Sequence, residues 1–364
     1  MTVPYDLSKE LSRRGHEVTI ITSDFEYDAR YAKKITDLGM RVVPFRCLAD
    51  IGLFLYSPSM KKWLAHNLKN YDVIHLNNFR SYQNSVVCHY ARQLQIPYVL
   101  QAHGSTPRIV EKGNLKSLYD WIWGKSILRD ASAFLAVTET EVKQYETAGA
   151  EKNKIVMIPN GLDAAKFNQN TKRGLFRRRI GINKTDKLIL YLGRLHKGKG
   201  IDFLLDSFAL MNNKDCILAI SGPDDGELVL LKERSRRLGV AGRVRFTDFV
   251  ENVSEAYVDA DVVVNPASNE IFGLVPLEAL LSGTQVIVTD ECGCGDLIHR
   301  MDGGYLVKFK DTAGLSRAMD YSLNHPAEGR KLVENAKKYI INNLTWEIIA
   351  ANMEEIYENC IRDF

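Results

Sequence analysis

The sequence has 364 residues, of which 45% are hydrophobic and 26% charged, so it has enough apolar material for large cores and too little bias for a disordered or fibrous protein. At roughly 150 residues per domain, this length predicts two domains. The formal net charge of +3, from 48 basic and 45 acidic residues, excludes a strongly basic nucleic-acid-binding protein, and we expect no nucleic-acid partner.

Short apolar runs bounded by turn residues alternate with amphipathic stretches along the chain. Strands are expected at 17–22, 42–45, 73–76, 98–101 and 133–137, and then at 156–158, 188–192, 217–220, 244–246, 262–264 and 286–288. Helices are expected, among others, at 5–14, 226–238, 277–281 and 346–361. The strands are rich in Val and Ile and apolar on both faces, as in buried parallel sheets. Two such strand–helix series predict two Rossmann-like domains joined near 158–163.

Local signals support these boundaries. Gly15 follows the first expected helix as a C-terminal cap. Thr138 and Glu141 have the spacing of a capping box, so we interpret Thr138 as a helix cap and not as a catalytic hydroxyl.

The sequence gives no evidence of export or membrane spanning. No apolar run approaches the roughly 18 residues of a membrane span, and the N-terminal residues are charged where a signal peptide would be apolar. The six cysteines are too scattered for a disulfide framework. Cys292 and Cys294 lack a second ligand pair, so we expect a tight glycine turn and no metal site. A cytoplasmic protein is expected.

The segment 266–283 carries the first candidate site. A strand runs into a loop, and a helix is expected to start near Gly273, with Pro276 in its first turn. The backbone N–H groups of Phe272, Gly273 and Leu274 would then lie at the positive end of a helix, where a phosphate is favoured.

Two carboxylates bracket this segment. Glu270 lies in the loop, and Glu278 lies on the helix, where its side chain can lean back toward the same ligand. The alternative for Glu278 is a glutamate that merely faces solvent.

The segment 191–205 carries the second candidate site, again where a strand hands over to a helix. Arg194 and Lys199 are suited to hold a polyanion. The alternative is a P-loop, because Gly193, Gly198 and Lys199 match most of that pattern, but Gly200 stands where Ser or Thr would bind Mg²⁺. No G-x-G-x-x-G follows a strand, which weighs against NAD or FAD.

Two basic regions could concern an acceptor. Residues 112–129 mix Lys, Arg, Trp and Leu, as an interfacial helix would, and residues 172–179 form a basic run. An ordinary half-buried helix or solvated face is the preferred interpretation of each. Peripheral contact with a membrane is the alternative, and it would imply a lipid-linked acceptor.

GRLHKGKG (193–200) together with EIFGLVPLE (270–278) resembles the retaining glycosyltransferases of family 4, which have the GT-B architecture. The resemblance extends to RRGHEVTIIT (13–22), AHG (102–104), IPNGLD (158–163), VRFTDFV (244–250) and TWEIIAANMEEIY (345–357). It implies an α/β fold with two Rossmann-like domains whose parallel sheets face across a cleft. The domains would be an acceptor-side domain at 1–163, completed by a returning helix at 345–364, and a donor-binding domain at 164–344.

The same resemblance implies a role for each candidate residue. Arg194 and Lys199 match the cations that hold the donor diphosphate, and the amides of Phe272, Gly273 and Leu274 match those over the phosphate. Glu278 matches the ligand of the donor ribose. Glu270 matches the carboxylate beside the sugar, and His103 the histidine that faces it, whereas His75 is interpreted as structural. The family implies a nucleotide-diphosphate sugar as donor, a glycan or lipid-linked acceptor, and neither metal nor cofactor.

One departure from the family concerns the first strand. Members open with a strand and a glycine-rich loop before the first helix, and neither precedes the helix expected at 5–14. In the order 3-2-1-4-5-6 this strand is central, so its neighbours are expected to be unpaired. This departure keeps open the alternative of a nucleotide-sugar-binding subunit without turnover. A second alternative, another GT-B enzyme such as a sugar-nucleotide epimerase or phosphorylase, ranks lower, because the sequence shows no lysine site for pyridoxal phosphate.

Overall fold

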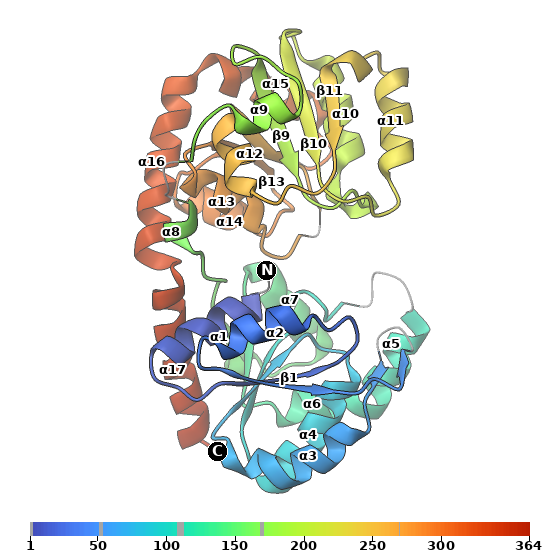
Figure 1. Ribbon diagram of the computed structural model, residues 1–364, viewed down its shortest axis with the longest axis vertical. Helices are drawn as coiled ribbons and strands as arrows, with labels where there is room; N and C mark the ends of the chain where they lie inside the picture. Colours follow the sequence, from blue (N-terminus) through green and yellow to red (C-terminus); the bar gives the residue numbers. More distant parts are fainter. Residues whose placement is uncertain (1–2, 51–53, 108–112, 168–170, 269) are drawn as a thin grey trace. The chain divides into compact units, whose positions relative to one another are not determined.

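The computed structural model describes residues 3–50, 54–107, 113–167, 171–268 and 270–364. The backbone divides into two compact units (Figure 1). The first comprises Met1–Gly161 together with Trp346–Phe364, and the second comprises Leu162–Thr345.

A six-stranded parallel sheet forms the centre of the second unit, in the order β11-β10-β9-β12-β13-β14. Its strands are β9 (Lys187–Leu192), β10 (Cys216–Ser221), β11 (Val244–Thr247), β12 (Val262–Asn265), β13 (Gln285–Thr289) and β14 (Tyr305–Val307). The chain builds outward from β9 in one direction and then, from β12, in the other. The point where the strand order reverses therefore lies between β9 and β12, and the crevice at the carboxyl ends of such strands is where open α/β sheets bind ligands.

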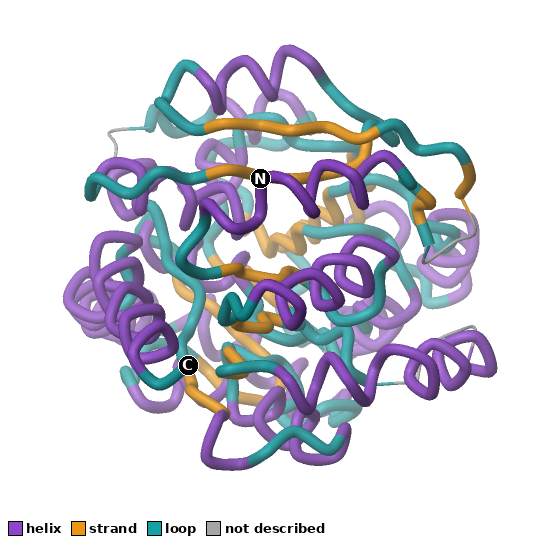
Figure 2. The backbone as a smooth tube through the Cα atoms, turned by 90° about the horizontal axis from the view of Figure 1, so that it is seen from below, coloured by secondary structure: helices purple, strands orange, loops and turns teal. Residues whose placement is uncertain are grey.

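Helices alternate along the chain with the strands of this unit, and they are drawn in purple in Figure 2. They are α8 (Ala164–Phe167), α9 (Leu175–Arg179), α10 (Ile201–Leu210), α11 (Leu228–Arg237), α12 (Val253–Asp259), α13 (Leu274–Leu281), α14 (Gly295–Arg300), α15 (Thr312–Asn324) and α16 (Pro326–Asn343). Four-residue β12 is buried throughout, as is β13, which explains why both read as unbroken apolar runs in the sequence.

The strands of the first unit form separate sheets. Two parallel strands, β1 (Thr19–Ser23) and β2 (Arg41–Phe45), make one of them. Four parallel strands make another, in the order β5-β6-β7-β8: β5 (Ile74–Asn77), β6 (Tyr98–Gln101), β7 (Ala133–Ala136) and β8 (Ile155–Met157). The short strands β3 (Ala49–Asp50) and β4 (Leu55–Tyr56) pair in antiparallel orientation.

Strands β1 and β5 each lie at a sheet edge in the described part of this unit. Among the described residues, β1 pairs only with β2, and β5 pairs only with β6. Both strands are less buried than β6 and β7, all of whose residues are buried. These are the two edges that the sequence leads us to expect without a partner.

The C-terminal helix α17 (Trp346–Arg362) belongs to the first unit, as predicted. Its buried Ile349 and Met353 share a core with Leu7 and Leu11 of helix α1 (Val3–Arg13). At the edge of this contact, the guanidinium of Arg14 donates to Glu354 at 2.7 Å. The remaining helices of the unit are α2 (Ala29–Thr36), α3 (Ser59–Asn67), α4 (Tyr82–Leu94), α5 (Gly113–Tyr119), α6 (Lys125–Asp130) and α7 (Glu139–Ala148).

All eleven predicted strands are present, with ends that shift by one or two residues. The sequence analysis missed β3, β4 and β14, which are too short to show a periodic pattern. Both predicted caps are confirmed: Gly15 has a φ of 101°, and the hydroxyl of Thr138 accepts from the backbone N–H of Glu141. No described helix is long and apolar enough to cross a bilayer.

Candidate functional site

The point between β9 and β12 brings two of the predicted residues together. Lys199 ends a short 3₁₀ turn, Lys197–Lys199, that follows β9, and Glu270 lies in the loop that follows β12. The Lys199 Nζ atom is 3.1 Å from Glu270 Oε2. Both side chains are partly exposed, so a ligand from solvent can reach a fixed cation beside a fixed carboxylate.

Neighbouring groups hold Glu270 in place. Asn265, the last residue of β12, donates from Nδ2 to Glu270 Oε2 at 3.3 Å and lies 3.7 Å from the sulfur of Cys292. The backbone N–H of Gly293 donates to the Glu270 carbonyl at 2.7 Å. The loop after β12 is therefore clamped by the turn after β13.

Gly273 connects this loop to α13. Its φ is 76°, in the left-handed region that favours glycine. A Cβ atom at this position would lie 2.9 Å from the sulfurs of both Cys292 and Cys294, which are 3.4 Å apart. The helix begins at Leu274, next to the predicted start. Its first backbone N–H groups have no acceptor within the helix, so this end suits an anion.

The cysteine pair forms the expected glycine turn. The N–H of Gly295 donates to the Cys292 carbonyl at 2.7 Å, and both thiols are buried. The hydrogen bond with the Cys292 thiol, followed by burial, raises the pKa of Cys294. Within the described parts of the chain, no three His, Cys, Asp or Glu side chains are grouped as metal ligands.

Arg194 and Glu278 have other contacts. Arg194 follows β9 and is exposed, and its Nη1 atom is 2.6 Å from Asp225 Oδ2. Glu278 is half-buried on α13, where its Oε2 accepts from the hydroxyl of buried Tyr257 at 2.8 Å. Burial followed by the charge of Glu278 raises the pKa of Tyr257, which keeps this hydroxyl a donor.

His103 is the candidate residue of the first unit. It follows β6 with a φ of 50°, an uncommon value for a non-glycine residue that is often found at functional sites. Its Nε2 atom is 2.9 Å from the Oδ1 of Asn77, which ends β5. Burial lowers the pKa of His103 to about 4, so the imidazole is neutral above that pH. With Nε2–H donating to Asn77, the lone pair of Nδ1 is available as an acceptor.

The turn that carries His103 is held by a buried carboxylate. Glu141 accepts from the backbone N–H of Gly104 at 2.6 Å and from that of Val137 at 2.9 Å. Burial raises the pKa of Glu141. Glu141 therefore has two roles: its backbone N–H donates to the cap residue Thr138, and its side chain fixes the backbone beside His103.

His75 fills a structural place, as expected. Its Nδ1 atom is 2.6 Å from the hydroxyl of Tyr357 on α17, and its Nε2 atom is 3.1 Å from Gln101 Oε1. Burial lowers its pKa to about 3. Neutral His75 thus connects β5 and β6 to the C-terminal helix.

Two family profiles cover most of the chain. The one described as Glycosyl transferases group 1 matches residues 172–339, and the one described as Glycosyltransferase Family 4 matches residues 2–166. The chain belongs to this family of glycosyltransferases.

Individual relatives agree with this assignment. An uncharacterized glycosyltransferase of Methanocaldococcus jannaschii is 27% identical over 97% of this chain and 92% of its own length. The N-acetyl-alpha-D-glucosaminyl L-malate synthase of Bacillus anthracis is 24% identical over 98% of this chain and 93% of its own. The solved structure of Anabaena Alr3699/HepE in complex with UDP has a TM-score of 0.79 at 18% identity, covering 98% of this chain and 95% of that one. The glycosyltransferase has the GT-B fold.

The basic run at 172–179 has a structural role in the glycosyltransferase. Arg177 is buried and donates to the carbonyl of Asp259 at 2.8 Å, to that of Asp186 at 2.6 Å, and to the Asp261 carboxylate at 2.9 Å. Arg178 and Arg179 are exposed on the same short helix. The preferred interpretation, an ordinary half-buried element, fits this region.

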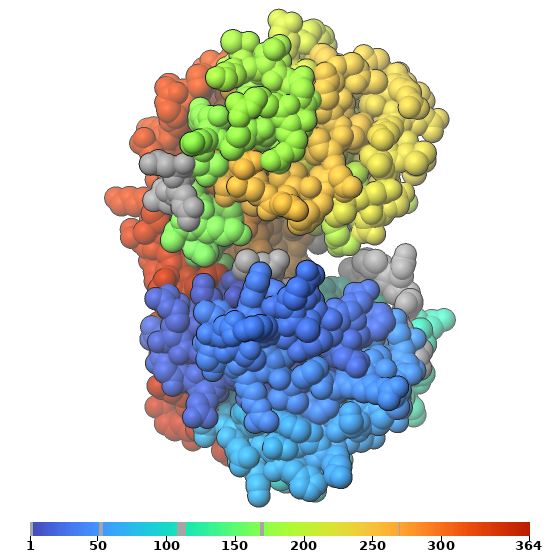
Figure 3. Space-filling view, in the orientation of Figure 1, coloured from blue at the N-terminus to red at the C-terminus, as the bar shows by residue number. Residues whose placement is uncertain are grey.

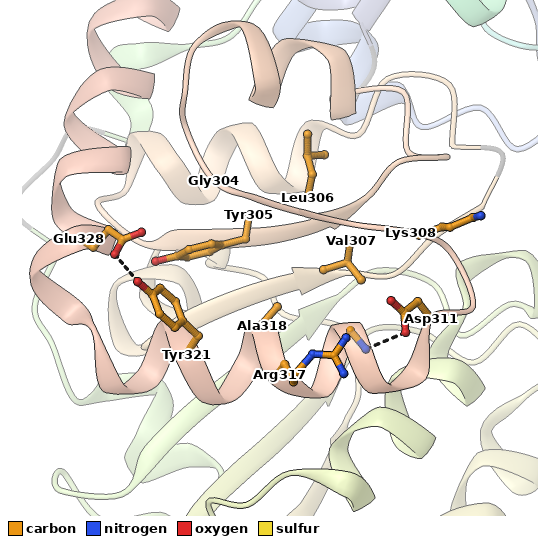
Figure 4. A pocket seen from close by; sticks show the side chains of 11 residues that line it. Gly304, Tyr305, Leu306, Val307, Lys308, Asp311, Arg317, Ala318, Tyr321 and Glu328 are labelled. Atoms are coloured by element: carbon orange, nitrogen blue, oxygen red, sulfur yellow. Dashed lines mark hydrogen bonds between the residues drawn. The ribbon is translucent and has the colours of Figure 1, made fainter.

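A shallow pocket of about 630 Å³ lies elsewhere on the second unit, between β14 and α15 (Figure 4). The hydroxyl of Tyr321 donates to Glu328 at 2.7 Å on its wall, and Asp311 accepts from the N–H of Gly314. None of the predicted site residues lines this pocket. The pocket is therefore separate from the candidate site that Lys199 and Glu270 form at the ends of β9 and β12.

Four polar partners escaped the sequence analysis: Asn265, Tyr257, Asn77 and Asp225. Two of them could have been proposed from the sequence, because Asn265 and Asn77 are polar residues at the very ends of apolar strands. Tyr257 and Asp225 lie in segments that give no such signal.

Proposed function

We propose that this glycosyltransferase moves a hexose from a nucleotide-diphosphate sugar to a glycan or lipid-linked acceptor, with retention of configuration and without a metal ion. The observation that carries the proposal is the pairing of Lys199 with Glu270 beside the start of α13. This places a cation, a carboxylate and a helix N-terminus where a doubly wound sheet binds ligands.

The donor diphosphate would be held by positive groups. Lys199 and the amides of Phe272, Gly273 and Leu274 would contact its phosphates, and Arg194 would join them by leaving Asp225. Glu278 would accept hydrogen bonds from the ribose hydroxyls, while its Oε2 atom accepts from the hydroxyl of Tyr257. The Anabaena protein of the same fold is solved with UDP-glucose, which supports a nucleotide-sugar donor here.

Cleavage of the donor separates charge. The departing diphosphate gains negative charge while the anomeric carbon becomes positive. Fixed cations and the positive end of α13 would stabilise the leaving group without reorganisation. Glu270 would stabilise the oxocarbenium-like centre, as carboxylates do in glycosidases. These charges come from the chain itself, which is why we propose catalysis without a metal.

His103 would contribute from the first unit as a neutral hydrogen-bonding group. Its Nδ1 atom would accept from a hydroxyl of the transferred sugar, since Nε2–H is engaged by Asn77. A positively charged imidazole would instead repel the developing positive charge, so the lowered pKa suits this role.

A donor screen tests the proposal. The full chain is incubated with UDP-, GDP- and ADP-hexoses and a panel of glycan and lipid-linked acceptors, and the anomeric configuration of any product is determined by NMR. We expect transfer with retention from at least one donor, still proceeding in the presence of EDTA, and its loss in Lys199→Ala but not in Lys197→Ala. Nucleotide binding without transfer across the panel would favour a binding subunit, and an inverted product would refute the retaining mechanism.

A further inference from the structure

The helical segment from α5 to α6 has apolar side chains on its buried face and also on its exposed face. A short π-helix, Asp120–Gly124, joins the two helices into one continuous segment. On the inner face, Tyr119 and Ile127 are buried in the core of the first unit, and the ring of Trp123 lies 5.3 Å from that of Phe54. This inner face satisfies the requirement for packing, since a surface helix needs only one apolar stripe.

The outer face of the same segment is apolar as well. Trp121 is 72% exposed, and Leu115, Leu118 and Ile122 are 53%, 52% and 44% exposed. Spacings of three and seven residues place Leu115, Leu118 and Ile122 on one side of the helix, with Trp121 beside them. In the space-filling view, α5 (turquoise) lies at the surface of the first unit (Figure 3).

The exposed charged residues from 114 to 129 are all basic. Asp120 is the one acidic residue from 114 to 129, and it is buried, where its carboxylate accepts from Nε and Nη2 of Arg80 at 2.8 Å each. Lys125 is exposed just beyond Ile122. The outer face therefore presents apolar groups and a cation to solvent, with no acidic side chain among them.

We propose that the outer face of this segment, made by Leu115, Leu118, Trp121, Ile122 and Lys125, binds the surface of an anionic lipid bilayer. Its apolar side chains would enter the interface between headgroups and acyl chains, where Trp is favoured, while Lys125 contacts the lipid phosphates. A two-fold contact between copies of the chain fits less well, because it would place the same cations against each other. The inference goes beyond the transfer reaction and does not depend on it.

Sedimentation with vesicles tests the inference on the full chain. The probes are phosphatidylcholine vesicles with and without phosphatidylglycerol. We expect the protein to sediment with the anionic vesicles and to be released by high salt, as electrostatic binding requires. In the double variant Leu118→Ser/Trp121→Ser the partition coefficient should fall at least tenfold, and Lys125→Glu should weaken binding to anionic vesicles alone.

The matched control is the double variant Val229→Ser/Leu230→Ser on α11. These side chains are 74% and 56% exposed but belong to the second unit, so we expect unchanged binding. Thermal unfolding of each variant checks that it folds. The proposal is overturned if the wild-type chain does not bind anionic vesicles, or if Leu118→Ser/Trp121→Ser binds as well as wild type. A dimer in light scattering that this variant converts to a monomer, without vesicle binding, would assign the face to a second copy instead.

Discussion

Lys199 and Glu270 form an ion pair at 3.1 Å although they are far apart in the sequence. They meet because β9 and β12, the strands that precede them, are neighbours in the sheet: Ile189 pairs with Val262. The pair has a consequence for binding. A diphosphate at this position would compete with Glu270 for Lys199, so in the proposed role the carboxylate would oppose nucleotide binding while it stabilises the sugar.

The variant Glu270→Gln separates these two effects. The amide keeps a hydrogen-bonding side chain of the same size but removes the negative charge, so Lys199 gains freedom to contact the phosphates. We expect nucleoside diphosphate affinity equal to or up to about tenfold above wild type, with transfer reduced by at least about a hundredfold. Calorimetry and a transfer assay measure the two quantities. Exposed Glu291→Gln serves as the control and should change neither, and a variant that keeps full transfer would contradict the role of Glu270.

The second prediction concerns the pH dependence set by Asn77. Burial lowers the pKa of His103 to about 4, so wild-type His103 becomes charged only as the pH falls toward that value. In Asn77→Asp, a carboxylate would face Nε2 and raise this pKa by about 1–3 units. The acidic limb of the kcat/KM profile should then move to higher pH by a similar amount. Titratable groups near this turn include Glu141, Tyr145 and His75, and they are unchanged in the variant.

Asn78→Asp is the matched control for this shift. Asn78 is exposed and adjacent in the sequence, so the same charge is added without facing Nε2. An identical pH profile for Asn77→Asp and wild type would show that His103 does not need to be neutral, or that Asn77 does not set its state.

The third prediction concerns stability through Arg177. Replacing this buried residue by Ala would remove its ion pair with Asp261 and leave the backbone carbonyls of three residues without this donor, so the free energy of unfolding should fall by about 3–5 kcal/mol. Urea unfolding followed by circular dichroism measures this change. Arg178→Ala, which removes an exposed arginine from the same helix, should cost less than about 0.5 kcal/mol. Equal effects of the two substitutions would contradict the structural role.

The fourth prediction concerns Gly161, which lies where the chain leaves the first unit. A Cβ atom here would lie 2.4 Å from the indole ring of Trp346, and the ring is buried against the core that contains Leu7. Gly161→Ala should therefore lower the free energy of unfolding by about 1–3 kcal/mol. In Gly242→Ala, the new methyl group would meet no atom within 4 Å, so thermal unfolding should be unaffected. A Gly161→Ala protein as stable as wild type would show that the indole can move aside.

The sequence was informative where local rules decide the structure. The Val- and Ile-rich strands, the cap at Thr138 and the start of α13 at Gly273 depend on neighbours in the chain, and all three could be predicted. The partners of the site residues depend on the fold. The sequence around Glu278 does not predict its hydrogen bond with Tyr257, because the two residues come together only when α12 packs beside α13.

The exposed apolar face of α5 to α6 also could not be predicted from the sequence. The mixture of Trp, Leu and Lys in residues 112–129 is compatible with a half-buried helix and with an interfacial one. The helical pattern cannot decide between them, because apolar residues occur around the whole circumference. Burial of Tyr119 and exposure of Trp121 in the folded chain show that both faces are apolar.

Nucleotide binding by Lys199→Ala is the most direct test of the central claim that the ends of β9 and β12 hold a donor diphosphate. Affinities for UDP, GDP and ADP are measured by calorimetry on the wild type, on Lys199→Ala and on Lys197→Ala, whose lysine is exposed on the same 3₁₀ turn. We predict that the wild type binds at least one of them, that Lys199→Ala weakens this affinity by about tenfold or more, and that Lys197→Ala binds as the wild type does. Equal affinities for all three proteins would contradict the account.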